Sequence, residues 1–201
     1  MRDKGIEITE EMKSAALREA ERREPHIRHW FQTGHYTLEQ TNVIGFIGEF
    51  AACVLLGIDW KSNIRPNYRT IDQQDIIFKG KRISVKTESL PREYLLPVIN
   101  REINDDEKYG RRLYPCGQKN LLKKYHIVIF GAILRVKGAT LEELLRKIDL
   151  WYPIGWIEAK KVLTYTPTSI APFGGRYPYP AFPVKTSELK DIEELLQAET
   201  I

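Results

Sequence analysis

Two residues of opposite charge, Asp75 and Lys86, stand at the two ends of a short segment that predicts a β-hairpin. Residues 76–78 and 83–85 are rich in strand-forming side chains, and Gly80 between them supplies the positive φ of a tight turn. Asp75 and Lys86 would then lie side by side at one end of the hairpin. A carboxylate that needs a cation, beside an ammonium that needs an anion, suits the handling of a phosphate group and a metal ion.

A third ionisable residue, Glu49, interrupts an apolar helix upstream of the hairpin. It is the only carboxylate between Val43 and Leu56, and burying a carboxylate without a partner is costly unless the group is neutralised. A metal ion or a lysine would remove that cost. Gly45 and Gly48 flank the face of Glu49 and let another backbone or a ligand approach closely. The alternative is a structural role, in which Glu49 takes an exposed position or pairs with an arginine.

The second strand of the predicted hairpin has two different faces. Period-two alternation places Ser84, Lys86 and Glu88 on one face and Ile83 and Val85 on the other. If the apolar face packs against the core helix, the three polar side chains stand in a row on the opposite face. Edge exposure is the ordinary alternative for each of them.

The aspartate before the hairpin also has an ordinary alternative. Asp75 begins its strand, a position at which aspartate commonly caps a turn. Asp72 lies nearby and competes for the same role.

Two helices are predicted before the hairpin. The first covers residues 9–24, from a threonine N-cap to the residue before Pro25. Residues 37–40 fit a capping box that opens a second helix, which continues to Leu56 and stops at Gly57. Because this second helix is apolar nearly all round, it should be buried.

After the hairpin, strands and helices alternate. Residues 126–134 form a nearly continuous apolar run, which is typical of a central strand. Further elements are a helix opened by the capping box at 140–143, a strand at 151–157, a helical turn at 158–162 and an amphipathic helix at 187–197. The polar residues 100–119 predict a surface excursion, and the proline-rich residues 166–183 an irregular segment. This order predicts an α/β domain around a mixed sheet.

The composition is that of a globular protein. A length of 201 residues suits one domain, and 42% hydrophobic with 29% charged residues argues against the disordered and membrane classes. No apolar run reaches membrane-spanning length, and the N-terminus lacks the apolar core of a secretory signal, so a cytoplasmic location is expected. Cys53 and Cys116 show no CxxC spacing and indicate neither a zinc site nor a disulfide framework.

The net charge of +4 permits a polyanionic partner without requiring one. Basic residues gather at 18–28, 79–82, 111–112 and 119–124, and tyrosines 109, 114 and 125 are interleaved with the last two groups. Phosphate contacts need such cations, and tyrosines can stack on bases or form hydrogen bonds. The alternative is an ordinary solvated surface.

These residues together resemble the pattern of the PD-(D/E)XK nuclease superfamily. Gly45-Phe-Ile-Gly-Glu49-Phe-Ala51 is similar to the glutamate motif of that family's first core helix, and Asp75 to the aspartate that opens its second strand. Ser84-Val85-Lys86 is similar to the acid-x-lysine of the third strand, with serine in place of the acid. The resemblance covers about residues 37–160.

The resemblance implies a restriction-endonuclease-like fold, which is a mixed β-sheet flanked by helices with an αβββαβ core. It divides the chain into an N-terminal helical extension at 1–36, a nuclease-like core at 37–165, and a proline-rich segment with a C-terminal helix that packs on the core at 166–201.

The implied activity is that of a metal-dependent DNA endonuclease, a hydrolase of phosphodiester bonds. Asp75, Glu49 and the backbone carbonyl of Val85 would bind Mg²⁺ or Mn²⁺ through hard oxygen atoms. Lys86 would orient the attacking water or stabilise the charge of the pentavalent phosphorus.

A homodimer is also implied, because two active centres are needed to cut two strands. An aromatic surface for that dimer could come from Trp30 and Phe31, or from residues 177–182.

Ser84 is the point at which the sequence departs from the family, because the acid expected there helps to bind the metal. Glu49 is the preferred source of the missing charge, and Glu88, farther along the same strand face, is the alternative. The departure also motivates a second hypothesis, a catalytically inactive nuclease-fold protein that binds DNA or serves in assembly.

A third hypothesis makes His26, His29 and His35 part of a zinc site. Pro25 and the absence of a nearby cysteine or acid pair argue against it.

Overall fold

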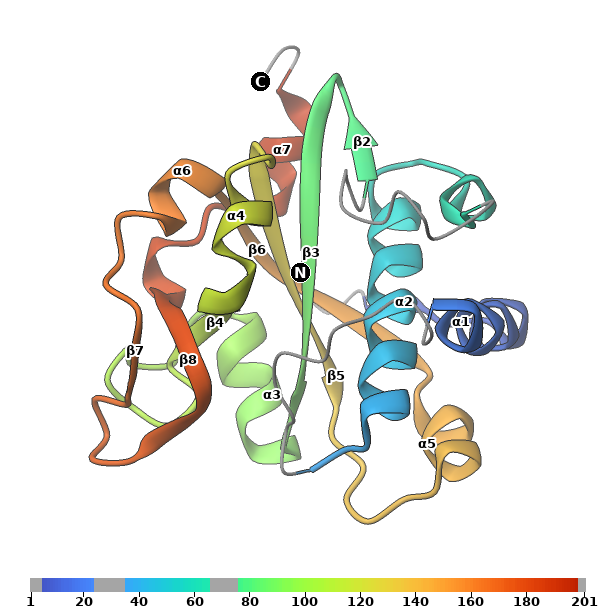
Figure 1. The fold of residues 1–201 in the computed structure, drawn as a ribbon, viewed down its shortest axis with the longest axis horizontal. Helices are drawn as coiled ribbons and strands as arrows, with labels where there is room; N and C mark the ends of the chain where they lie inside the picture. The colour runs from blue at the N-terminus through green and yellow to red at the C-terminus, as the bar shows by residue number, and fades with distance from the viewer. Residues whose placement is uncertain (1–4, 24–34, 66–75, 199–201) are drawn as a thin grey trace.

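The computed structural model describes residues 5–23, 35–65 and 76–198. A five-stranded mixed sheet with the order β1-β6-β5-β3-β2 forms its centre; β3 and β5 are parallel, and the other neighbours are antiparallel. Helices lie on both sides of this sheet (Figure 1). A second, antiparallel sheet has the order β4-β8-β7. The predicted α/β class, with a mixed sheet flanked by helices, is confirmed.

The strands are β1 (Ile6–Glu7), β2 (Ile76–Phe78), β3 (Lys81–Leu90), β4 (Arg111–Pro115), β5 (Ile127–Leu134), β6 (Leu150–Glu158), β7 (Thr168–Ile170) and β8 (Arg176–Lys185). The α-helices are α1 (Glu10–Arg23), α2 (Leu38–Leu55), α3 (Arg92–Ile99), α4 (Lys119–Leu122), α5 (Leu141–Lys147), α6 (Ala159–Val162) and α7 (Ile192–Gln197). Short 3₁₀ helices are η2 (Trp60–Asn63), η3 (Cys116–Gln118) and η4 (Thr186–Glu188).

The predicted hairpin is formed by β2 and β3. Phe78 pairs with Lys81, so the loop is the two-residue turn Lys79-Gly80. Both loop residues have positive φ, 47° and 75°, which matches the twist that a tight hairpin requires. The strand β2 begins at Ile76, and Asp75 lies outside the described residues, as does its competitor Asp72.

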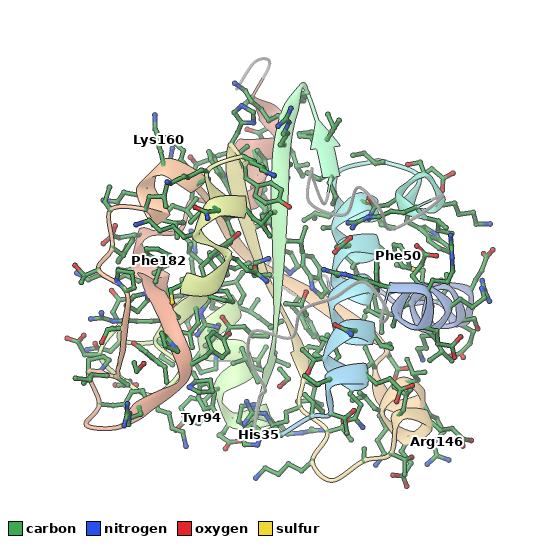
Figure 2. All side chains as sticks on the ribbon, viewed as in Figure 1. His35, Phe50, Tyr94, Arg146, Lys160 and Phe182 are labelled. Carbon is green, nitrogen blue, oxygen red and sulfur yellow. The ribbon has the colours of Figure 1, made fainter. Side chains whose placement is uncertain are left out.

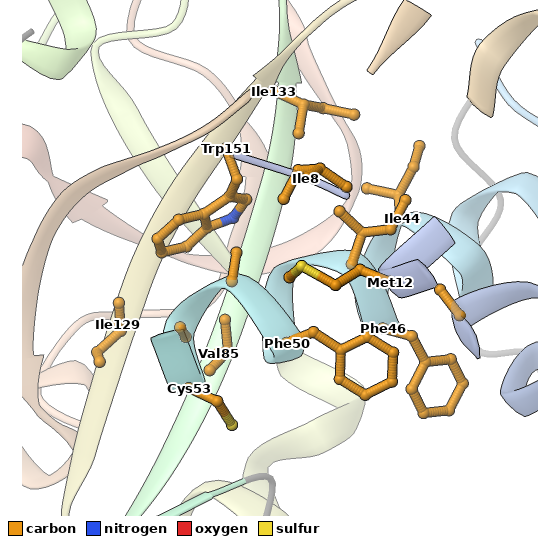
Figure 3. Packing of buried hydrophobic residues seen from close by; sticks show 14 of the residues in the cluster. Ile8, Met12, Ile44, Phe46, Phe50, Cys53, Val85, Ile129, Ile133 and Trp151 are labelled. Atoms are coloured by element: carbon orange, nitrogen blue, oxygen red, sulfur yellow. The ribbon is translucent and has the colours of Figure 1, made fainter. Parts of the chain in front are cut away.

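The apolar helix α2 is buried as predicted. It begins with a complete capping box between Thr37 and Gln40, and the chain turns away at Gly57, whose φ is 69°. Its aromatic residues Phe46 and Phe50 pack beside Met12 of α1, as Figure 3 shows.

Two apolar cores lie on opposite faces of the central sheet, and β5 contributes to both. Ile127, Ile129 and Ile133 face the core that includes α1, α2, α5 and α7, whereas Val128, Phe130 and Ala132 face the core that includes α3, α4, α6 and β8. Burial on both faces explains why this strand is apolar throughout. Figure 2 shows Phe50 and Phe182 on the two opposite sides of β3.

The strand β3 separates its side chains as predicted. Ile83 and Val85 belong to the core that includes α2. Ser84, Lys86 and Glu88 pair in parallel register with Val128, Phe130 and Ala132, which belong to the other core. Residues at paired positions of neighbouring strands share a face of the sheet, so the three polar side chains stand on the face opposite α2.

The predictions for residues 100–119 and 166–183 are wrong in part, because both segments contribute strands to the second sheet. The expected surface excursion contains β4, in which Arg112 and Tyr114 are fully buried. The expected irregular segment contains β7 and most of β8.

The prolines of β8 occupy positions where only one neighbouring strand pairs with it. The partner β7 pairs with residues 176–181 and β4 with residues 181–185. Pro178, Pro180 and Pro183 therefore each have a neighbour on one side, and the missing N–H groups do not have to interrupt a ladder on both sides.

The two ends of the described chain join the central sheet and its cores. The strand β1 pairs with β6, and α1 begins after Thr9, whose hydroxyl accepts a hydrogen bond from the Met12 N–H at 3.2 Å. At the other end, α7 starts only at Ile192, after Asp191 as N-cap, and is shorter than predicted. Within the described ranges, no helix has the length and apolar character needed to cross a membrane.

Candidate functional site

A cavity of about 510 Å³ lies along β3 and reaches both faces of the central sheet. Five consecutive residues of β3, from Val85 to Ser89, line it, although alternate residues of a strand point to opposite faces. The reason is that β2 pairs with β3 only as far as Ile83, and no other described strand continues along that edge. The residues that line the cavity come from this edge and from α2, β4 and β8. In Figure 1, α2 lies on one side of β3, and β4 and β8 lie on the other.

Glu49 lines this cavity from α2 and is buried, with 6% of its surface exposed. Its Oε2 atom accepts hydrogen bonds from Asn63 Nδ2 at 3.2 Å and from Arg65 Nη2 at 3.1 Å. The interpretation of an exposed glutamate is therefore wrong. The alternative of a glutamate paired with an arginine agrees with the structure, and it supplies a cation where the sequence suggested a metal or a lysine.

The two glycines beside Glu49 differ in the free space around them. A Cβ atom on Gly48 would lie 1.8 Å from Thr87 Oγ1, and the Thr87 hydroxyl also accepts a hydrogen bond from Trp151 Nε1 at 3.1 Å. Gly48 thus lets α2 approach β3 closely. Gly45 has nothing within 4 Å of its Cβ position and lines the cavity.

Lys86 lines the same cavity from β3 and is partly buried. Its ammonium lies 4.9 Å from the centre of the Tyr114 ring and donates a hydrogen bond of 3.4 Å to the Val85 carbonyl. The ring face stabilises the cation without neutralising it. Lys86 and Glu49, which the sequence assigned to one site, therefore border one cavity.

The other two residues of the polar face of β3, Ser84 and Glu88, are held within the protein. Ser84 is fully buried, and its hydroxyl oxygen has no hydrogen-bond partner among the described residues. Glu88 accepts a hydrogen bond of 2.9 Å from Nη1 of Arg112, a side chain with no exposed surface. Burial raises the pKa of Glu88 above its ordinary value, and Arg112 opposes that rise.

Arg112 leads from Glu88 to a second group of residues, in which Tyr109 was expected from the sequence as an interleaved tyrosine and Arg135 was not. It also donates to the backbone carbonyl of Tyr109, whose φ of 64° is unusual for a residue with a side chain. The Tyr109 hydroxyl accepts a hydrogen bond from Arg135 Nη1 at 2.8 Å, and Arg135 Nη2 donates to the Ser89 carbonyl at 2.6 Å. This network connects the wall of the cavity back to β3.

The cavity wall is rich in cations. Seven arginine or lysine side chains line it, against the three glutamates Glu49, Glu88 and Glu107. The pKa of His35, which also lines the cavity, is lowered by burial and then by the positive charges of Arg135, Lys137 and Lys108. The wall therefore favours an anionic ligand.

The predicted basic clusters contribute only part of this surface. Arg23 and Arg111 line the cavity. Lys79 instead donates hydrogen bonds to the carbonyls of Leu196 and Ala198, in and just after α7. Arg65, Arg135 and Arg176 are cavity residues that stand outside every predicted cluster. The interleaved tyrosines were a more consistent signal, since Tyr109, Tyr114 and Tyr125 all line the cavity.

Of the three ligands predicted for Mg²⁺ or Mn²⁺, two belong to residues that line the cavity: the carboxylate of Glu49 and the carbonyl of Val85, both hard oxygen donors. No cluster of three or more His, Cys, Asp or Glu side chains forms within 5–23, 35–65 and 76–198. Asp75, the other predicted ligand, lies outside these ranges, as do His26 and His29 of the zinc hypothesis.

Comparisons of the chain with protein-family models, with curated proteins and with solved structures found no match.

Of the two aromatic segments suggested for a dimer surface, the one at 177–182 does not agree with the structure. Phe182 is buried in the second core and Tyr177 lines the cavity, so residues 177–182 do not form a free aromatic surface. Trp30 and Phe31 lie outside the described residues.

Proposed function

We propose that the protein is a metal-dependent DNA endonuclease and that the cavity along β3 is its active site. One observation carries the proposal: Glu49 of α2 and Lys86 of β3, which are distant in sequence, line the same cation-rich cavity. A site for phosphodiester chemistry needs cations that balance the charge of the phosphate and of the transition state.

The arrangement of the elements also supports the proposal. The chain runs from the buried helix α2 through the hairpin β2 and β3 to the helix α3. It then passes through β4 and α4 before it reaches β5, which is parallel to β3. This agrees with much of the restriction-endonuclease-like core that the resemblance implies. That fold assignment is part of the proposal.

Lys86 is the residue proposed to act directly on the reacting phosphate. The face of the Tyr114 ring and the Val85 carbonyl hold its ammonium at the cavity wall. From there the ammonium would orient the attacking water or stabilise the negative charge that develops on the phosphate oxygens.

Asp75, Glu49 and the Val85 carbonyl would hold Mg²⁺ or Mn²⁺, which supplies polarisation of the phosphate when bound. Arg65 balances the charge of Glu49 and, with Asn63, fixes the orientation of the carboxylate. Glu88 is the alternative ligand, and it is paired with the buried Arg112 as Glu49 is paired with Arg65. The homodimer and the cytoplasmic location belong to this proposal as predictions.

A second candidate function is a nuclease-fold protein that binds DNA without cutting it. The observation that favours it is the state of the polar strand face: Ser84 replaces the acid, and the neighbouring carboxylate of Glu88 is held by Arg112. This candidate predicts salt-sensitive DNA binding that does not depend on a divalent ion.

Cleavage assays separate the two candidates. The purified protein is incubated with linear, single-stranded, flapped and four-way DNA in Mg²⁺, in Mn²⁺ and in EDTA. We expect cleavage that requires the divalent ion and that is lost in Asp75→Asn and Lys86→Ala. Lys81→Ala, a lysine of the same strand outside the cavity, should cut normally. Binding without cleavage under every condition would support the second candidate and contradict the first.

A further inference from the structure

The cavity has the dimensions of a small-ligand site. A volume of about 510 Å³ falls within the range, roughly 300–1,000 Å³, of pockets that enclose small molecules and cofactors. A B-form duplex, whose major groove alone is about 12 Å wide, is too large to enter such a space. A single nucleotide that is out of the base-paired stack fits within it.

Aromatic side chains are concentrated in this cavity. Six of the ten tyrosines of the chain line it. Tyr177 and Tyr179 stand two residues apart on β8, so they share one face of the strand, and they are less exposed than Arg176, Pro178 and Pro180 between and beside them. Tyrosine rings placed on one strand face can stack on the faces of successive bases, whatever their sequence.

Tyr177 also offers an unused polar group. Its hydroxyl is buried and has no hydrogen-bond partner among the described residues. Buried hydroxyl groups are ordinarily hydrogen-bonded, so a ligand in the cavity would complete the environment of this one.

Tyr109 is held rigidly at the cavity wall. Its ring centre lies 4.7 Å from that of Tyr94, its hydroxyl accepts from Arg135, and its backbone carbonyl accepts from Arg112. A residue with a side chain keeps a φ of 64° only when its surroundings fix it there. Arg135 and Lys108 also lie over this ring, 5.3 and 5.6 Å from its centre, so a bound base would meet a ring and two cations whose positions are already set.

Cations accompany these rings. Lys108, Arg111 and Arg176 line the cavity together with Tyr109 and Tyr177. A positively charged groove interleaved with aromatic side chains is the combination by which proteins bind single-stranded nucleic acid, with the cations contacting phosphates and the rings contacting bases.

We propose that the cavity binds an unpaired nucleotide, so that the preferred ligand is DNA with a single-stranded segment, a flap or a flipped-out base. This inference rests on the proposed function for the identity of the nucleic acid. In it, the tyrosines of β8 and Tyr109 hold the base, and the adjoining phosphate lies toward Lys86.

Binding measured without a divalent ion tests this inference separately from cleavage. Fluorescence anisotropy in EDTA compares a labelled thymidine 12-mer, a blunt duplex and the same duplex with a single-stranded flap. We expect the single strand and the flap to bind roughly 10-fold or more tightly than the blunt duplex, the contribution of about one stacked base. A blunt duplex that binds as tightly, with no rise in fluorescence when it carries 2-aminopurine, would overturn the inference. A rise in 2-aminopurine fluorescence would show a flipped-out base in the bound duplex and would support the inference.

Variants of Tyr177 identify the cavity as the site of this binding. Tyr177→Ala should weaken single-strand binding by roughly 10-fold or more, and Tyr177→Phe, which removes only the unpaired hydroxyl, should weaken it less. Tyr152→Phe, on β6 and outside the cavity, is the matched control. Unchanged affinity in a folded Tyr177→Ala protein, as judged by circular dichroism, would contradict the proposal.

The two proposals can fail independently. Preferential binding of single strands with no cleavage in Mg²⁺ or Mn²⁺ would support the nucleotide cavity and contradict the nuclease. Metal-dependent cutting of blunt duplex without preference for unpaired DNA would support the nuclease and contradict the nucleotide cavity.

Discussion

Arg65 Nη2 lies 3.1 Å from Glu49 Oε2, in an ion pair whose two side chains are only 15% and 8% exposed. This pair supplies a positive charge for the glutamate that interrupts the apolar helix α2. It also fixes the carboxylate at the wall of the cavity, where the proposed metal would need it.

Removing the arginine should therefore destabilise the fold. We expect Arg65→Ala to lower the free energy of unfolding by about 2 to 3 kcal/mol, because it leaves a buried carboxylate with less compensation. Urea denaturation measures this change. Lys160→Ala, which breaks an ion pair with Glu158 in which the lysine is 86% exposed, is the control and should change stability by less than about 0.5 kcal/mol. Equal stability of Arg65→Ala and wild type would show that the pair does not support the fold.

The two glycines of α2 give a matched pair of variants with opposite expected signs. Gly48→Ala should destabilise the protein by about 1 to 3 kcal/mol, because its Cβ would lie 1.8 Å from Thr87 Oγ1. Gly45→Ala meets no atom within 4 Å and should stabilise the helix by up to about 1 kcal/mol. Thermal denaturation of both variants is the measurement. A stabilising Gly48→Ala would mean that α2 and β3 are farther apart than described.

His35 reports on the charge of the cavity. Burial and the positive charges of Arg135, Lys137 and Lys108 lower its pKa below the ordinary value of 6.5. Bound phosphate groups would offset those charges, so the pKa of His35 should rise when single-stranded DNA is added. NMR titration of the imidazole, assigned by its loss in His35→Gln, follows both values. A pKa that falls on addition of DNA would argue against an anion in the cavity.

Glu88 should make stability depend on pH in a defined direction. Its pKa is raised by burial in the folded state, so the folded protein binds a proton more tightly than the unfolded chain does. The stabilising contribution of that proton is complete below the ordinary pKa of about 4.5 and is lost as the pH rises through the folded-state pKa. Urea denaturation across this range should show a decline in wild type that is smaller in Glu88→Gln. An equal decline in the two proteins would assign the effect to other groups.

Much of the fold could be predicted because its strongest signals are local. The capping box at Thr37, the turn at Gly80 and the apolar run of β5 depend on residues close in sequence. Such signals set the ends of a helix, the loop of a hairpin and the burial of a strand without knowledge of distant partners.

The second sheet could not be predicted, because its buried residues depend on distant partners. Arg112 appears in a polar, charged stretch, and its burial in β4 requires Glu88, 24 residues earlier. Pro178 and Pro180 argue against a strand unless the one-sided pairing of β8 is known.

Part of the candidate site could also be predicted from the sequence, and part could not. Chemistry and alternation indicated Glu49 and Lys86 as neighbours of one site, and both line the cavity. Arg65, which pairs with Glu49, and Arg135, which donates to Tyr109 and Ser89, come from other parts of the chain. No pattern of neighbouring residues marks them, so the cationic wall could not be predicted from the sequence.

The central claim is that Lys86 acts in phosphodiester cleavage, and a single-turnover rate tests it most directly. With the protein in excess over a labelled flap DNA in Mn²⁺, the rate at saturation separates chemistry from binding. We predict that Lys86→Ala lowers this rate by about 100-fold or more, as loss of a residue that stabilises transition-state charge does, and that Lys81→Ala leaves it unchanged. A rate for Lys86→Ala within a factor of about two of wild type, well below that expected loss, would contradict the account.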